Sequence, residues 1–267
     1  VGAVGGPILL WDGRLQEAGS IVWRDGSCLG YGRGDSPDAP AYHFVRDVDY
    51  CSGAFLMVRR ALFDQLGRFD DAFAPAYYEE SDFCVRLWKA GQRIVYDPNV
   101  RIKHFEFASD VNSGQAMALQ ARNRERFVEK HSDFLATKLP SAPQHVLRAS
   151  QVLPPHAKRV LIIDDRVPFP SLGRGYPRAC MIANLIGESG GALTYFPLQI
   201  PEGDWSTVHT VLRAQTEVIL NEGLPGLKRF LAERAASFDL IVISRPHNME
   251  PFARIREQNP EWFAHAT

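Results

Sequence analysis

The sequence predicts an α/β protein built from two pieces and a linker, and three observations support this class. Residues 1–137 alternate short apolar runs with helical patterns, and residues 138–157 contain four prolines and no apolar period. From residue 158 onward strands and helices alternate again. We therefore expect domains at 1–137 and 158–267, joined by a Pro-rich linker at 138–157.

In the first piece, residues 1–10 and 47–58 have strand-like content, and Asp12-Gly13 is a turn signal between two extended runs. The Gly-, Asp- and Pro-rich segment 25–40 predicts a mobile surface loop. Helical patterns follow at 59–66, ended by Gly67, and at 117–134. A buried strand is expected at 93–96, and it should end at Asp97-Pro98.

The best helix of this piece is expected at 79–90. Phe83 and Leu87 lie four residues apart and so share one face of a helix. Acidic residues fill the first turn and Gly91 follows the last, which are typical start and stop signals.

In the second piece, short apolar strands are expected at 159–163, 192–197 and 239–244. Helices are expected near 178–186, 205–221 and 225–236. This alternation predicts a parallel sheet with helices on both faces.

The composition excludes several classes of function. The 267 residues are 45% apolar and 23% charged, with a net charge of −1 and no basic block, which argues against nucleic acid as the main partner. No apolar run is long enough to span a bilayer, and no signal-peptide pattern opens the chain. The four cysteines lack metal-ligand spacing and disulfide density, so we expect a reduced, cytoplasmic protein. The chain starts on Val within an apparent strand, and we expect it to be a fragment of a longer polypeptide.

A series of motifs between Cys51 and His104 carries a family resemblance. In order they are C-S-G-A-F-L-M-V-R-R, G-R-F-D-D-A-F, Y-Y-E-E-S-D-F-C-V-R-L-W-K-A-G, I-V-Y-D-P and I-K-H. This series resembles the C-terminal, acceptor-binding half of a family 2 glycosyltransferase with the GT-A fold, a partial mixed sheet with flanking helices. The resemblance implies transfer of a sugar from a nucleotide diphosphate to a hydroxyl, with inversion.

The resemblance also assigns roles. The second acid of Glu79-Glu80 matches the family's general base, with Glu in place of the commoner Asp, and Asp82 matches a supporting acid. A carboxylate suits proton removal from an acceptor hydroxyl. The alternative is that acids in a first helical turn only complement the helix dipole.

Other candidates surround this acidic pair. Gly53 and Ala54 let the backbone approach a sugar or simply pack in a strand, and the aromatic Tyr78 is a candidate for substrate binding. Arg86 is a candidate for binding a carboxylate or diphosphate, although pairing with Asp82 four residues earlier is favoured. His104 matches a family histidine near the metal and diphosphate, with a surface or packed histidine as the alternative.

The second piece contains V-L-I-I-D-D-R-V-P-F-P, G-R-G-Y-P-R and F-D-L-I-V-I-S-R-P. These resemble the N-terminal Rossmann-like half of a GT-B, family 4-like, glycosyltransferase. Gly175 stands where backbone N–H groups can meet phosphate, and Arg178 matches an arginine of the related loop. A receiver domain with an acidic pocket at Asp164-Asp165 is disfavoured, because Ser244 stands where its acceptor Asp would be.

The implied partners are a nucleotide-sugar donor and a glycan or lipid-linked glycan acceptor. The implied cofactor is a divalent cation, Mn or Mg, whose main Asp-x-Asp ligands are expected outside this chain. The parent protein would build cell-surface polysaccharide or lipopolysaccharide in the cytoplasm, with possible peripheral association at the inner face of the membrane. The rival interpretation is a non-catalytic carbohydrate-binding or scaffold module made of degenerate transferase domains.

Overall fold

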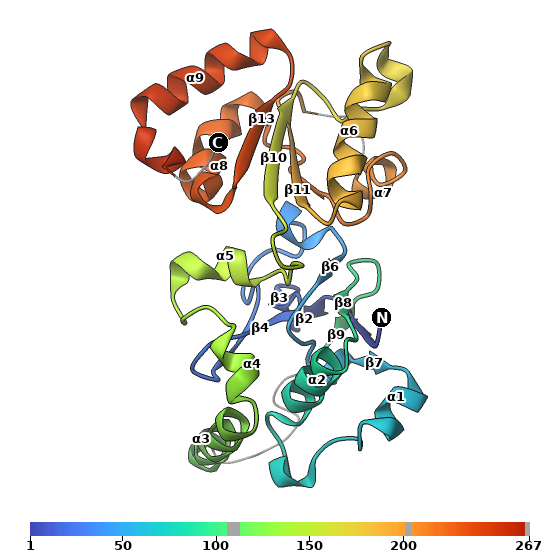
Figure 1. The fold of residues 1–267 in the computed structure, drawn as a ribbon, viewed down its shortest axis with the longest axis vertical. Helices are drawn as coiled ribbons and strands as arrows, with labels where there is room; N and C mark the ends of the chain where they lie inside the picture. Colours follow the sequence, from blue (N-terminus) through green and yellow to red (C-terminus); the bar gives the residue numbers. More distant parts are fainter. Residues whose placement is uncertain (106–112, 201–203, 265–267) are drawn as a thin grey trace. The chain divides into compact units, whose positions relative to one another are not determined.

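A computed structural model describes residues 1–105, 113–200 and 204–264 (Figure 1). The chain forms two compact units, Val1–Val152 and Leu153–Thr267. Each unit combines helices with at least one sheet, and the second contains a fully parallel sheet. The predicted α/β class is confirmed.

The first unit is organised around a mixed four-stranded sheet. Its strand order is β6-β8-β1-β7, in which β1 runs parallel to β8, while β7 and β6 run antiparallel to their neighbours. All three residues of β8 are buried, as expected for the apolar run at 93–96. The strands are β1 (Ala3–Gly5), β6 (Arg46–Asp47), β7 (Met57–Val58) and β8 (Ile94–Tyr96).

Two smaller sheets complete this unit. The Asp12-Gly13 turn joins two antiparallel strands as predicted, and Gly13 adopts a φ of 88°, which glycine tolerates best. Residues 28–30, expected in a mobile loop, instead pair with residues 20–22. The strands are β2 (Ile8–Leu9), β3 (Leu15–Glu17), β9 (Ile102–Lys103), β4 (Ser20–Val22) and β5 (Cys28–Gly30).

The helices of the first unit agree with the sequence patterns to within a few residues. The expected apolar face of α2 is fully buried in the core, including Phe83 and Leu87 at 0% exposure. The helical pattern at 117–134 corresponds to two helices in the structure, because the helix is interrupted at His131. The helices are α1 (Arg60–Gln65), α2 (Glu79–Lys89), α3 (Ser113–Lys130) and α4 (Ser132–Ala136).

The segment predicted as a linker is largely packed onto the first unit. Lys138 Nζ lies 2.5 Å from Asp49 Oδ1, and the Val152 amide donates to the Asp47 carbonyl at 2.8 Å. A short helix, α5 (Val146–Ala149), interrupts the segment. Val146 and Ala149 of this helix pack against the hydrophobic core of the first unit, a contact that the proline content of the segment did not predict. The division between the units falls after Val152.

The second unit holds a parallel sheet of order β12-β11-β10-β13. Side chains of alternate residues in β10 pack into two separate hydrophobic cores, one on each face of the sheet. Leu161 and Ile163 belong to one core, and Val160 and Ile162 belong to the other. Helices therefore cover both faces, as predicted. The strands are β10 (Arg159–Asp164), β11 (Ala192–Pro197), β12 (Glu217–Val218) and β13 (Leu240–Ile243).

One helix expectation in the second unit is wrong. Of residues 205–221, only α7 (Trp205–Val208) is helical, and β12 occupies part of the remainder. Several β-branched residues in this stretch favour extended structure, and pairing with β11 decides the outcome. The other helices are α6 (Tyr176–Glu188), α8 (Gly223–Arg234) and α9 (Met249–Gln258).

Candidate active site

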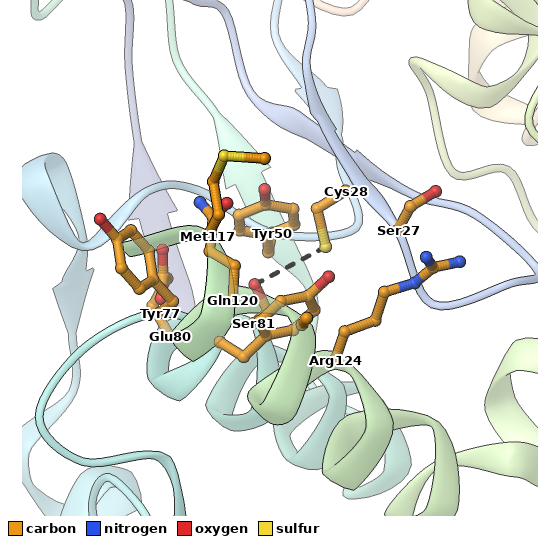
Figure 2. Close-up of a pocket in the computed structure, with 11 residues that line it drawn as sticks. Ser27, Cys28, Tyr50, Tyr77, Glu80, Ser81, Met117, Gln120 and Arg124 are labelled. Carbon is orange, nitrogen blue, oxygen red and sulfur yellow. Dashed lines mark hydrogen bonds between the residues drawn. The ribbon is translucent and has the colours of Figure 1, made fainter. Parts of the chain in front are cut away.

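A pocket of about 470 Å³ lies at the start of α2 in the first unit (Figure 2). Its walls are mainly aromatic and polar, with Tyr50, Tyr77 and Tyr78 on one part and α3 side chains such as Met117 on another. Glu80 is the acid that lines it. The pocket therefore combines aromatic faces, on which sugar rings commonly pack, with a carboxylate.

An unusual backbone turn presents this acid. Tyr77 and Tyr78 both adopt left-handed conformations, with φ of 71° and 75°. Two consecutive non-glycine residues in this region are uncommon, and each costs on the order of 1 kcal/mol or more. The turn directs the chain into α2, whose first two residues are Glu79 and Glu80.

The surroundings of Glu80 raise the pKa of its carboxyl group. Its Oε2 is buried and accepts no hydrogen bond within the described parts of the chain. Burial, followed by the nearby charges of Glu79 and Glu17, raises the pKa of Glu80 to about 7 from an ordinary value of 4.5. A carboxyl group with a pKa near neutrality is well matched to general-base catalysis at physiological pH.

Glu79 shares part of this environment. Its Oε2 is also buried without a hydrogen-bond partner among the described residues, and burial raises its pKa. Unlike Glu80, it does not line the pocket. The two adjacent acids therefore differ in position: Glu80 lines the pocket and Glu79 does not.

The predicted Gly-Ala segment lies against Glu80. Gly53 begins a short 3₁₀ helix, Gly53–Phe55, and a methyl group added to Gly53 would lie 3.8 Å from Cβ of Glu80. The preceding amide, Ser52 N–H, donates to the buried carboxylate of Glu17 at 3.0 Å. Ala54 is exposed beside Gly53, so this segment forms an open edge next to Glu80.

Asp82 occupies a different environment from Glu80, although it lies only two residues further on. It is fully buried, and its carboxylate contacts Arg86 Nε at 2.8 Å, Lys130 Nζ at 2.6 Å and His131 Nε2 at 2.8 Å. Burial tends to raise the pKa of Asp82, but hydrogen bonds from His131 and Lys130 and the charge of Arg86 together hold it below its usual value. This acid ties α2 to the end of α3.

The pairing expected for Arg86 is present. Besides Asp82, its guanidinium donates to the carbonyl oxygens of Leu66 and Arg68, the latter at 2.6 Å. All three guanidinium nitrogens therefore have partners inside the protein. Arg86 does not line the pocket that contains Glu80.

Tyr78 does line the pocket, and two contacts fix its ring. Its hydroxyl donates to the Gly26 carbonyl at 3.0 Å, and its ring lies 5.2 Å from that of Phe127 on α3. Both contacts hold the aromatic wall in place beside Glu80.

His104 lies just after β9 and is half-buried. Its Nδ1 lies 2.9 Å from Gln16 Oε1, which leaves Nε2 as the nitrogen available to a ligand. Among the described residues no group of three His, Cys, Asp or Glu side chains could hold a metal ion. Within those residues His104 supplies at most one ligand, and the structure does not bring the other metal ligands to it.

The second unit places its candidates on the surface. Gly175 is the residue before α6 and Arg178 lies in its first turn, and both are exposed. Asp164 and Asp165, at the end of β10, are engaged by Arg245 Nε at 2.9 and 3.1 Å.

Sequence reasoning missed several side chains near Glu80. Arg124 and Gln120 line the pocket from α3, a helix in which the sequence analysis named no candidate residue, and Cys28 lines it from β5. Asn123, which lies between the lining residues Gln120 and Arg124, is fully buried. A polar residue within a run of charged ones, N-R-E-R, carries no periodic signal that would separate it from its exposed neighbours.

No family model matches the chain. It is 32% identical over 114 residues to an N-acetylglucosaminyl-diphospho-decaprenol L-rhamnosyltransferase of Mycobacterium tuberculosis, covering 42% of this chain and 35% of the relative. It is 38% identical over 58 residues, 22% of each protein, to rhamnosyltransferase WbbL of Escherichia coli. An uncharacterized protein of Sinorhizobium fredii, y4gI, is 29% identical over 114 residues, 41% of this chain and 12% of that protein.

These relatives support a glycosyltransferase family for the matched part of the chain. The matches span between about a tenth and a third of the relatives' own lengths. In the described parts of the chain, no helix has the length and apolar character needed to cross a membrane.

Proposed function

We propose that the first unit is the acceptor-binding half of an inverting glycosyltransferase and that Glu80 is its general base. One observation carries the proposal: Glu80 lines an aromatic pocket with a carboxylate oxygen that is buried and has no hydrogen-bond partner among the described residues. A buried carboxylate oxygen left without a partner is costly, and carboxyl groups with perturbed pKa values are concentrated at functional sites.

The reaction follows from this arrangement. The Glu80 carboxylate removes the proton of an acceptor hydroxyl while that oxygen attacks the anomeric carbon of the donor sugar. A new carbon–oxygen bond forms, and the bond to the nucleotide diphosphate breaks, the diphosphate leaving with the electron pair. Attack opposite the leaving group inverts the anomeric centre.

The acceptor side of the proposal rests on the pocket and on the relatives. Three tyrosines offer flat apolar faces with hydroxyl groups at their edges, which suits a sugar ring. A relative named for an N-acetylglucosaminyl-diphospho-decaprenol acceptor makes a lipid-linked glycan the favoured acceptor class. Synthesis of a cell-surface polysaccharide or lipopolysaccharide at the inner face of the membrane is the corresponding cellular role.

The donor side lies mostly beyond the described residues. A divalent cation, Mn or Mg, would neutralise the leaving diphosphate, with His104 as one ligand and Asp-x-Asp carboxylates expected outside this chain. Because the described residues do not form a complete metal site, no step above is assigned to the metal. In the second unit, Gly175 and Arg178 are proposed to contact substrate as part of a GT-B-like half.

The test is the substitution Glu80→Gln in the full-length protein, assayed for sugar transfer. Removing the base while keeping its shape should lower turnover by roughly 10²-fold or more. The matched control is Glu79→Gln, which changes a neighbouring acid outside the pocket and should cost much less. Turnover within a few-fold of wild type for Glu80→Gln would remove Glu80 from the mechanism, whereas absence of transfer by the wild-type full-length protein would favour the non-catalytic carbohydrate-binding module.

A further inference from the structure

We propose that Asn123 is a positioning residue for this reaction, whose carboxamide holds the turn that presents Glu80 to the pocket. The inference rests on the proposed role of Glu80. It concerns a side chain on α3 that does not itself line the pocket.

The contacts of Asn123 are concentrated on one short segment. Its Nδ2 donates to the carbonyl oxygens of Phe73 at 2.8 Å, Ala76 at 2.9 Å and Tyr77 at 2.9 Å. Asn123 is 0% exposed, so its amide is shielded from water. Because the Nδ2 group carries two hydrogens, one N–H is shared between two of these carbonyls, and the single buried amide serves all three backbone acceptors of the chain that leads into α2.

That segment needs an external support. Tyr77 and Tyr78 are both left-handed, and Tyr78, the residue before α2, makes no side-chain capping hydrogen bond. Strained conformations persist only where the surrounding structure fixes them. The Tyr77 carbonyl, which accepts a hydrogen bond from Asn123 Nδ2, belongs to this strained pair and lies three residues before Glu80.

The orientation of the amide is itself fixed. Arg122 Nε donates to Asn123 Oδ1 at 3.1 Å, which leaves Nδ2 to face the turn. An aspartate of the same shape would place a carboxylate against three carbonyl oxygens and could donate to none of them. The position therefore requires a donor of this size.

The neighbouring arginines provide an internal comparison. Arg122 Nη2 donates to the Ala74 carbonyl at 2.9 Å, and Arg126 Nη1 donates to the Ala72 carbonyl. Both contacts hold the same segment, but at its outer part, and both arginines are exposed. Removing Arg126 should loosen residues 72–74 without releasing the Tyr77 carbonyl.

The consequence for Glu80 can be measured without a substrate. Burial is the main reason that its pKa stands near 7, so a loosened turn that admits water should return the pKa toward 4.5. In Asn123→Ala we expect the pKa of Glu80 to fall by about one unit or more. In Arg126→Ala, the matched control, it should stay near the wild-type value.

The experiment is a ¹³C NMR titration of the whole chain labelled at its glutamate side-chain carboxyls, with the Glu80 signal assigned by its loss in Glu80→Gln. A folded Asn123→Ala protein in which the pKa of Glu80 is unchanged would overturn the inference, even if its thermal stability falls. If Asn123→Ala does not fold, Asn123→Ser keeps one hydroxyl donor and should give an intermediate pKa. An unchanged value in Asn123→Ser overturns the inference equally.

Transfer kinetics of the full-length protein give a second readout. A misplaced base should lower kcat by roughly 10-fold or more, and KM should change less, because Tyr50 and the α3 side chains of the pocket wall do not depend on this turn. Failure of the proposed function is separable: if Glu80→Gln leaves transfer unchanged, Glu80 is not the base. The titration then still reports whether Asn123 holds its position.

Discussion

Glu80 and Asp82 lie in the same turn of α2, yet their surroundings differ in every respect that matters for a carboxylate. Asp82 meets an arginine, a lysine and a histidine, and its pKa is held low. Glu80 has no such partner among the described residues, and its pKa is raised to about 7. The comparison teaches that two buried acids on one helix can divide the work, one securing the fold and the other kept available for chemistry.

The largest effect on stability is expected from Asp82→Asn. This change removes the charge that three partners share at a site with 0% exposure, and breaking such a buried pair typically costs about 3 kcal/mol or more. Urea denaturation of the first unit at neutral pH would measure the loss. Asp133→Asn, which breaks an exposed ion pair with Lys89, is the control and should cost far less, because solvent screens exposed charges.

The contribution of Asp82 also has a defined pH window. Because its folded-state pKa lies below the ordinary value of 3.8, its stabilisation is fully present at neutral pH and is lost only as the pH falls through the folded-state value. If Asp82→Asn and wild type have equal free energies of unfolding at pH 7, Asp82 does not stabilise the fold, and the proposed difference in role between Asp82 and Glu80 is wrong.

The opposite sign is expected for Glu80, with a smaller effect. Its folded-state pKa lies above its unfolded value of 4.5, so ionisation of Glu80 opposes folding increasingly as the pH rises through about 7. Glu80→Gln should therefore be more stable than wild type at pH 8, by roughly 1–3 kcal/mol, and about equal to it at pH 4. Urea unfolding at both pH values measures the difference, and a Gln variant less stable than wild type at pH 8 would contradict it.

The division between Glu80 and Asp82 was only partly predictable from sequence. The helix, its buried face and the Asp82–Arg86 pair follow from periodicity and i, i+4 spacing, because such contacts are local. Lys130 and His131 reach Asp82 from more than 45 residues away, and Asn123 reaches the turn before α2 over a similar separation. A one-dimensional pattern carries no signal for such contacts.

The same limit explains the error in the second unit. A helix was expected near residues 205–221, yet residues 217–218 pair with β11. Parallel pairing is a long-range event, and it overrides weak local preferences. The short strands β10, β11 and β13 were predictable because each is a continuous apolar run bounded by turns.

The smallest expected effect is that of Glu79→Gln on the pKa of Glu80. It tests which cause, burial or a neighbouring charge, makes Glu80 differ from Asp82. Burial is the larger cause of the raised pKa of Glu80, and the charge of Glu79 is the next. Glu79→Gln removes that charge but leaves the burial, so the pKa of Glu80 should fall by only about half a unit. The acid limb of kcat/KM in the full-length protein, which reports the free enzyme's base, should move to lower pH by the same amount. A shift of the limb all the way to the ordinary value of 4.5 would mean that repulsion between the two acids, and not burial in the pocket, sets the base apart from Asp82.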